Sequence, residues 1–249
     1  MITPRKFLFT IAAIFFALNS FAQPPAAKQV DPNYDNKAKT ILDDVSKTAK
    51  SYSSITASFS ISLKKANGTP DVKNGSIIMK SGRYKILLEN VIKGVSKKEE
   101  YFNDGITTWV FSEKDKEVTV DCAPDPNARK NENSISPNDI FTIHEKGFKY
   151  KFVKEETLNG KVVQVIDLFP EKPDKKNYHT VKLTIDKLKK QIITVIFMHK
   201  DQSTTTYSIK TLSPNLEVTD ASFQFDAKSH PGVSVVDLRP EEGCIPKGK

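Results

Sequence analysis

Apolar and polar residues alternate along most of this chain. The first clear run covers residues 55–63, where Ile55, Phe59 and Leu63 belong to an apolar set interleaved with serine and threonine. A period of two is typical of a β-strand with one buried and one hydrated face. The same pattern predicts strands over residues 75–80, 83–89, 97–102, 106–112, 117–121, 149–155, 162–169, 179–186, 191–199 and 204–212. Phe223 and Phe225 continue the alternation near the C-terminus.

Two segments have helical spacing instead. In residues 35–52, apolar side chains recur at steps of three and four, which predicts an amphipathic helix. In residues 136–146, Ser136 is placed to cap a short helix that begins at Pro137 and ends before Gly147. Its apolar residues are Ile140, Phe141 and Ile143.

The order of these elements predicts a mainly β protein with few helices. Short turns join most of the strands, such as 81–82 and 103–105, and no crossover helices separate them. A single antiparallel sheet is therefore expected, and two helices are available to cover one face of it. The inward side chains either fill a core or line a ligand cavity, and periodicity leaves both alternatives open.

The N-terminus has the pattern of a secretory signal peptide. Arg5 and Lys6 precede an almost wholly apolar stretch over 7–18, and small residues follow at Ser20 and Ala22. Cleavage after Ala22 is expected. The stretch is shorter than the roughly 20 residues that span a bilayer. Residues 1–22 are therefore predicted to be a signal peptide and the proline-rich residues 23–34 a flexible linker.

Charge and side-chain chemistry favour binding over catalysis. The formal net charge is +8, but lysines alternate with apolar residues along the strands, which indicates a hydrated surface and no nucleic-acid partner. The four histidines have no metal-ligand spacing, and nucleophile and phosphate-loop motifs are missing. We expect no catalytic residues, no metal and no cofactor. Cys122 and Cys244, the two cysteines of an exported chain, are candidates for a disulfide.

Two motifs add a family resemblance. The first is Asp104-Gly105-x-x-x-Trp109-x-Phe111; the second runs from Phe223-x-Phe225 through Pro231-Gly232-Val233-x-Val235-x-Asp237-x-Arg239. With the order of the elements, they make residues 35–239 resemble the periplasmic outer-membrane lipoprotein carrier family (LolA-type). The resemblance implies an unclosed half-barrel with a helical lid over an apolar cavity, and a monomer. Residues 240–249 form a C-terminal tail outside the pattern.

The resemblance also implies a function. Such a carrier would bind acylated lipoproteins released by an inner-membrane ABC-type complex and pass them to an outer-membrane acceptor. The alternative is a LolA-like module that binds or senses lipids or other amphiphiles without lipoprotein trafficking. The implied cavity residues are Phe59, Ile77, Met79, Tyr84, Ile86, Leu88, Trp109, Phe111, Ile140, Phe141, Ile143 and Phe197. The family commonly has an Arg-Pro pair where this chain has Ser81-Gly82, so Arg83 is the candidate to latch the lid.

Overall fold

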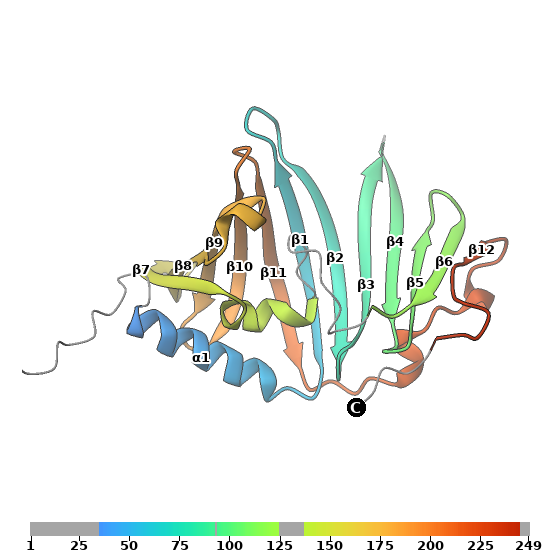
Figure 1. The fold of residues 1–249 in the computed structure, drawn as a ribbon, viewed down its shortest axis with the longest axis horizontal. Coiled ribbons are helices and arrows are strands. Elements are labelled where there is room, and N and C mark those ends of the chain that lie inside the picture. Colours follow the sequence, from blue (N-terminus) through green and yellow to red (C-terminus); the bar gives the residue numbers. More distant parts are fainter. Residues whose placement is uncertain (1–34, 93, 125–136, 245–249) are drawn as a thin grey trace, which may run out of the picture. The chain divides into compact units, whose positions relative to one another are not determined.

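Twelve strands form one sheet in the computed structural model, which describes residues 35–92, 94–124 and 137–244 (Figure 1). The predicted signal peptide, the linker and the Ser136 cap lie outside the described residues. The strands are β1 (Ile55–Lys64), β2 (Asp71–Lys80), β3 (Arg83–Ile92), β4 (Val95–Asn103), β5 (Thr107–Ser112), β6 (Glu117–Cys122), β7 (Phe148–Leu158), β8 (Lys161–Pro170), β9 (Tyr178–Asp186), β10 (Gln191–His199), β11 (Thr204–Pro214) and β12 (Ser234–Asp237).

The sheet is curved and does not close. Its strand order is β12-β6-β5-β4-β3-β2-β1-β11-β10-β9-β8-β7, so β12 and β7 form its two edges. Neighbouring strands are antiparallel except β12 and β6, which are parallel. The predicted fold class is confirmed: the chain is mainly β, with a single unclosed, curved antiparallel sheet.

The helical elements lie on both faces of this sheet or at its ends, with α1 and η1 on one face and η3 on the other. Helix α1 (Asn36–Lys50) corresponds to the predicted amphipathic helix. The short 3-10 helices are η1 (Pro137–Glu145), η2 (Pro173–Lys175), η3 (Asp220–Phe223) and η4 (Ala227–Ser229). None of the described helices is long and apolar enough to cross a bilayer.

Asp35 fixes the start of α1 and joins it to the sheet. Its carboxylate accepts hydrogen bonds from the backbone N–H groups of Lys37 and Ala38, at 2.7 and 3.2 Å. The other carboxylate oxygen accepts the N–H of Phe152 in β7, at 3.1 Å. Because first-turn N–H groups have no partner within a helix, this cap stabilises α1 and also sets its position against the sheet edge.

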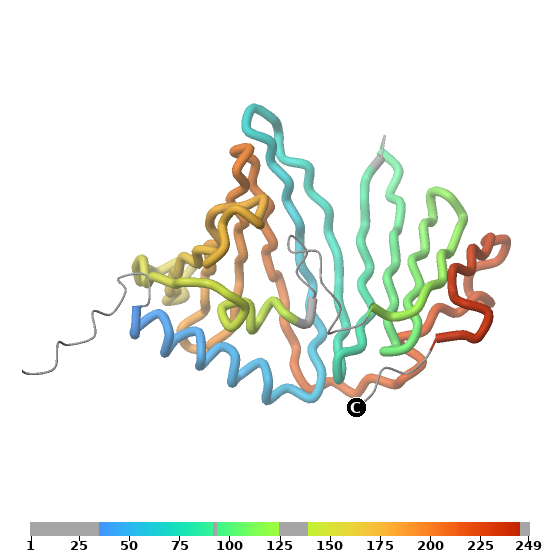
Figure 2. Tube along the Cα trace, viewed as in Figure 1, coloured from blue at the N-terminus to red at the C-terminus, as the bar shows by residue number. Residues whose placement is uncertain are grey.

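The main core lies between α1, η1 and strands β7–β10. We call the face of the sheet that packs against these helices the inner face. Figure 2 shows α1 and the segment around residues 137–147 running across it. The buried members of this core are Ala38, Leu42, Val45, Ile143, Phe148, Tyr150, Ile166, Leu168, Tyr178, Val181, Leu183, Ile185, Ile192, Val195 and Phe197.

The C-terminal segment packs on the opposite, outer face. Phe225 lies 5.9 Å from the ring of Phe102 and 5.6 Å from the ring of Phe111. The alternation at Phe223 and Phe225 does not form a strand: Phe223 ends η3 and is fully buried. A disulfide joins Cys122, at the end of β6, to Cys244, with the Cα atoms 5.3 Å apart.

Candidate ligand-binding cavity

Three rows of side chains cross the inner face of β1–β4. Strand register aligns residues on adjacent strands, and residues two apart on one strand share a face. The rows are Ile55 with Met79, Tyr84 and Asn103; Ala57 with Ile77, Ile86 and Tyr101; and Phe59 with Gly75, Leu88 and Glu99. The helices cover β7–β10, so the inner face of β11 and β1–β4 continues beyond the packed core.

Eight side chains of these rows line a cavity of about 360 Å³, a volume within the usual range for ligand sites. One wall consists of Ile140 and Phe141 from η1, and another of side chains from β10 and β11. The described lining residues are Ile55, Ala57, Phe59, Ile61, Ile77, Met79, Ile86, Leu88, Tyr101, Ile140, Phe141, Tyr178, Phe197, His199, Thr205, Tyr207 and Ile209.

Gly75 permits close packing in the floor of the cavity. A Cβ atom at this position would lie 2.6 Å from the carbonyl oxygen of Leu87 and 2.8 Å from the ring of Phe59. It would also lie 2.9 Å from the side chain of Leu88. A strand glycine of this kind marks a close approach of neighbouring groups. Here the missing side chain lets Phe59 and Leu88 lie against the backbone of β2.

The three tyrosines of the lining have raised pKa values, so their hydroxyl groups stay protonated at neutral pH. Burial raises the pKa of Tyr101 to about 12, and its hydrogen bond to Glu99 contributes to the rise. Burial raises the pKa of Tyr178 to about 12 and also raises the pKa of Tyr207. Nε2 of His199 is hydrogen-bonded to Oγ1 of Thr205, at 2.9 Å. A lining made mostly of aliphatic side chains and protonated phenols suits a hydrocarbon chain, because most of this surface has no need of hydration.

The structure brings eight of the twelve predicted cavity residues together along this cavity. They are Phe59, Ile77, Met79, Ile86, Leu88, Ile140, Phe141 and Phe197. Tyr84 is also on the inner face but packs against the cluster of Ile55 and Met79. Ile143 is 3 % exposed and belongs to the main core. Whether the eight bind a ligand remains a prediction.

Trp109 and Phe111 lie on the outer face, so their predicted place in the cavity is corrected. Trp109 pairs with Phe102, and Tyr101, next to Phe102 in β4, is the residue that points into the cavity. Phe111 packs instead on the outer-face segment, with its ring centroid 4.5 Å from that of His230. In a strand a one-residue offset reverses the face, and the sequence alone did not fix which face of β5 turns inward.

Several lining residues were missed by sequence reasoning. Thr205, Tyr207 and Ile209 alternate along β11, and this pattern was visible as a strand. What the pattern lacked was the pairing of β11 with β1, which places Tyr207 opposite Ile61 and Ile209 opposite Phe59. The two strands are far apart in sequence, so only the sheet order identifies their shared wall.

Arg83 does not latch the lid. Its guanidinium Nη1 lies 2.8 Å from Oδ1 of Asp220, and the group sits 5.0 Å from the ring centroid of Phe223. Both partners belong to the C-terminal segment on the outer face. The position predicted for a lid contact therefore anchors η3 to β3 through an ion pair and a cation–π contact.

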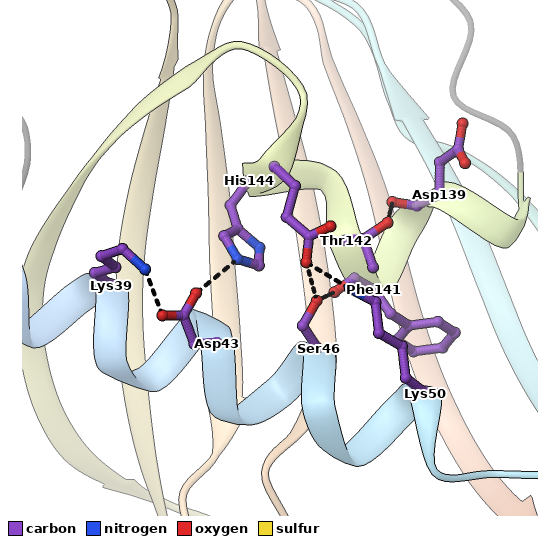
Figure 3. Close-up of polar contacts among 9 residues, drawn as sticks. Lys39, Asp43, Ser46, Lys50, Asp139, Phe141, Thr142 and His144 are labelled. Atoms are coloured by element: carbon purple, nitrogen blue, oxygen red, sulfur yellow. Dashed lines mark hydrogen bonds and ion pairs between the residues drawn. The ribbon is translucent and has the colours of Figure 1, made fainter.

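Contacts with α1 hold η1 in place, and we call η1 the lid (Figure 3). Ser46 Oγ donates a hydrogen bond to the Glu145 carboxylate at 2.8 Å, and Lys50 Nζ reaches the same oxygen at 2.8 Å. The buried His144 has its Nε2 atom 3.5 Å from Oδ1 of Asp43. Thr142 has non-helical φ and ψ angles, so the lid is kinked there. The kink lies between Phe141, which faces the cavity, and Ile143, which enters the core.

In the part of the chain that the structure describes, no cluster of histidine, cysteine and acidic side chains could hold a metal ion. The expectation that the protein has no catalytic site remains a prediction.

The sequence matches no protein-family model and no curated protein. Solved structures do resemble it. LolA-like proteins are among them. An uncharacterized conserved protein from Thermus thermophilus is 10 % identical, covers 80 % of this chain and 98 % of its own, and has a TM-score of 0.49. LprF from Mycobacterium bovis is 12 % identical, covers 75 % of this chain and 96 % of its own, and has a TM-score of 0.46. A LolA superfamily protein from Nitrosomonas europaea is 11 % identical, covers 76 % of this chain and 98 % of its own, and has a TM-score of 0.38.

Acid should weaken the contacts between the lid and α1. Hydrogen bonds from Lys50 and Ser46 lower the pKa of Glu145 below its usual 4.5, and burial lowers the pKa of His144 below its usual 6.5. A group with a lowered pKa in the folded state stabilises the fold above its unfolded pKa, and this contribution disappears as the pH falls through the folded value. Both groups therefore disfavour the closed lid on acidification, His144 from about pH 6.5 and Glu145 from about pH 4.5 downward.

Glu145→Gln tests this expectation by thermal unfolding between about pH 7 and about pH 4. The variant should melt slightly below the wild type at neutral pH, because the ion pair with Lys50 is half exposed and worth less than about 1 kcal/mol. The difference should shrink in acid. Glu156→Gln, which breaks an exposed pair with Lys154, is the matched control. A difference between Glu145→Gln and wild type that does not change with pH would contradict the prediction.

Proposed function

We propose that this protein binds the acyl chain of a lipid or lipoprotein in the cavity and carries it through an aqueous compartment. The observation that carries the proposal is the cavity of about 360 Å³ with its mostly apolar lining. Burying a methylene group is worth about 0.8 kcal/mol. A methylene is similar in size to a water molecule, roughly 30 Å³, so the cavity has room for about a dozen. Their burial offers up to about 10 kcal/mol of gross binding energy, before the costs of ordering the chain and the protein.

The lid supplies a route for loading and release. Phe141 closes one side of the cavity, and the lid is held by the burial of Ile143 in the main core and, among the described residues, by polar contacts with Ser46, Lys50 and Asp43. Half-exposed ion pairs contribute little to stability, so the part of the lid before the kink at Thr142 would open at a lower free-energy cost than Ile143, which is anchored in the core. A carrier needs such a segment, because the ligand must be hidden during transit and exposed at both ends of it.

The finer proposal is a periplasmic carrier of lipoproteins. In this role the protein would accept acylated lipoproteins from an inner-membrane ABC-type complex and deliver them to an outer-membrane acceptor. The signal-peptide pattern of residues 1–22 and the two sequence motifs support it. The second candidate is a carrier or sensor of a single-chain amphiphile, and a single chain of about a dozen methylenes fits the cavity volume.

Native mass spectrometry of the mature protein, expressed in its own cell from the full-length sequence and isolated from the periplasm, tests the proposal. A mass increment that matches a triacylated peptide supports lipoprotein transport. An increment that matches a single-chain lipid supports the second candidate. If no acyl-chain ligand is found and the protein also fails to bind an acyl-chain fluorophore, the proposed function is wrong.

A further inference from the structure

A basic row follows the three rows that form the cavity floor. On the inner face, the positions after Phe59, Gly75 and Leu88 are Ile61, Lys73 and Asn90. Ile61 lines the cavity and pairs directly with Lys73, and Asn90 pairs with Lys97. Asn74 of β2 pairs with Glu89 of β3, so the residues that follow this pair toward the strand ends, Lys73 and Asn90, lie opposite each other. The inner face therefore changes from apolar to basic at the end of the cavity nearest the β1–β2 and β3–β4 turns.

The two lysines of this row are available to a ligand. Both are half-buried, and no ion pair or side-chain hydrogen bond engages either of them within the described residues. Lys85, on the outer face of the same sheet, pairs with Glu100 at 3.0 Å. Glu99 lies two residues from Lys97 on the inner face of β4, and its carboxylate accepts a hydrogen bond from the Tyr101 hydroxyl at 3.0 Å.

The spacing of the row suits a small anionic group. Neighbouring strands are about 4.8 Å apart, so the backbones at Lys73 and Lys97, two strands apart, are about 10 Å apart. Lysine side chains are long and flexible, and both ammonium groups can converge on one carboxylate or phosphate from this distance. An acyl chain in the cavity would place its head group at this row.

We propose that the ligand is an amphiphile with a single acyl chain and an anionic head group, which Lys73 and Lys97 bind at the cavity mouth. This inference rests on the proposed function and defines the chemistry of its ligand. The shared chemistry of the head group is a carboxylate, as in a fatty acid, or a phosphate, as in a single-chain phospholipid.

Equilibrium binding to three ligands of equal chain length tests the proposal. The ligands are dodecanoate, dodecyl phosphate and the neutral dodecanol, each measured by displacement of an acyl-chain fluorophore from the mature protein. The wild type should bind at least one of the two anions about tenfold more tightly than dodecanol. The double variant Lys73→Gln, Lys97→Gln should lose this preference and keep its affinity for dodecanol.

The matched control is the double variant Lys64→Gln, Lys98→Gln. It removes the same charge at the same end of the sheet, but both positions alternate onto the outer face. This control should keep the preference for anions. The preference of the wild type should also decline as salt is raised, since partly exposed charges are screened.

Each result decides a separate point. A preference for dodecanoate alone identifies a fatty acid, and a preference for dodecyl phosphate alone identifies a phospholipid head group. Equal affinity of the wild type for all three ligands overturns the inference and leaves the proposed function intact. Equal loss in the Lys64 and Lys98 control also overturns it, because the effect would then come from net charge. A wild type that binds the fluorophore but none of the three ligands also overturns the inference, and a wild type that does not bind the fluorophore either contradicts the proposed function itself.

Discussion

Phe141→Glu should reduce acyl-chain binding at least tenfold while the protein stays folded. Phe141 lines the cavity and is half-buried, in contact with the main core and with the cluster around Met79. A carboxylate at this position is hydrated at the lid, and a bound acyl chain would have to displace that water. Burying an unpaired charge against hydrocarbon costs several kcal/mol, so the bound state loses most of its stability. Titration with an acyl-chain fluorophore measures the effect, and circular dichroism checks the fold.

Phe152→Glu is the matched control for Phe141→Glu. Phe152 is also half-buried on the inner face, but it packs against the main core outside the cavity, with Lys37 3.5 Å above its ring. This variant should bind the fluorophore as the wild type does. Ala57→Trp provides a second test without added charge, because the larger side chain would occupy the cavity from its floor. Undiminished binding in a folded Phe141→Glu protein and in Ala57→Trp would show that the chain binds elsewhere.

Removal of the disulfide should give the largest loss of stability. The bond between Cys122 and Cys244 joins residues 122 positions apart. In the chain-entropy model, a loop of this length corresponds to about 4–5 kcal/mol. For a protein of this size that loss lowers the melting temperature on the order of 10 °C. We expect this shift in the double variant Cys122→Ser, Cys244→Ser, measured by calorimetry.

We expect removal of the disulfide to loosen the C-terminal segment on the outer face. Cys244 follows, in the sequence, the segment that packs Phe225 on Phe102 and Phe111. The same segment places Asp220 against Arg83. The inner cavity is on the opposite face, so fluorophore binding at low temperature should change little. Reductant should lower the melting temperature of the wild type to that of the double variant and should leave the variant unchanged. A double variant that melts with the wild type would contradict the prediction.

The sequence was sufficient for most of the elements up to β11 and for about half of the residues that line the cavity. Alternation predicts β1 and β10 because each has one buried face, and three-and-four spacing predicts α1 because Ala38, Leu42 and Val45 share one helical face. Phe141 and Ile140 could be assigned to a short helix between strands for the same reason. These patterns depend on residues close in sequence, whose relative directions follow from helix and strand geometry.

The sequence by itself therefore determined the kind of element over most of residues 35–212 and the mainly antiparallel sheet, but not the 3-10 helix that Phe223 ends nor the parallel strand β12. The tertiary structure decided which face of each strand turns inward and which strands share a wall. It placed Trp109 and Phe111 on the outer face, Tyr207 in the cavity and Arg83 beside Asp220. The physical reason is that alternation gives two equivalent faces for an isolated strand. Only pairing with distant strands, and burial against α1 and the C-terminal segment, makes one face the interior.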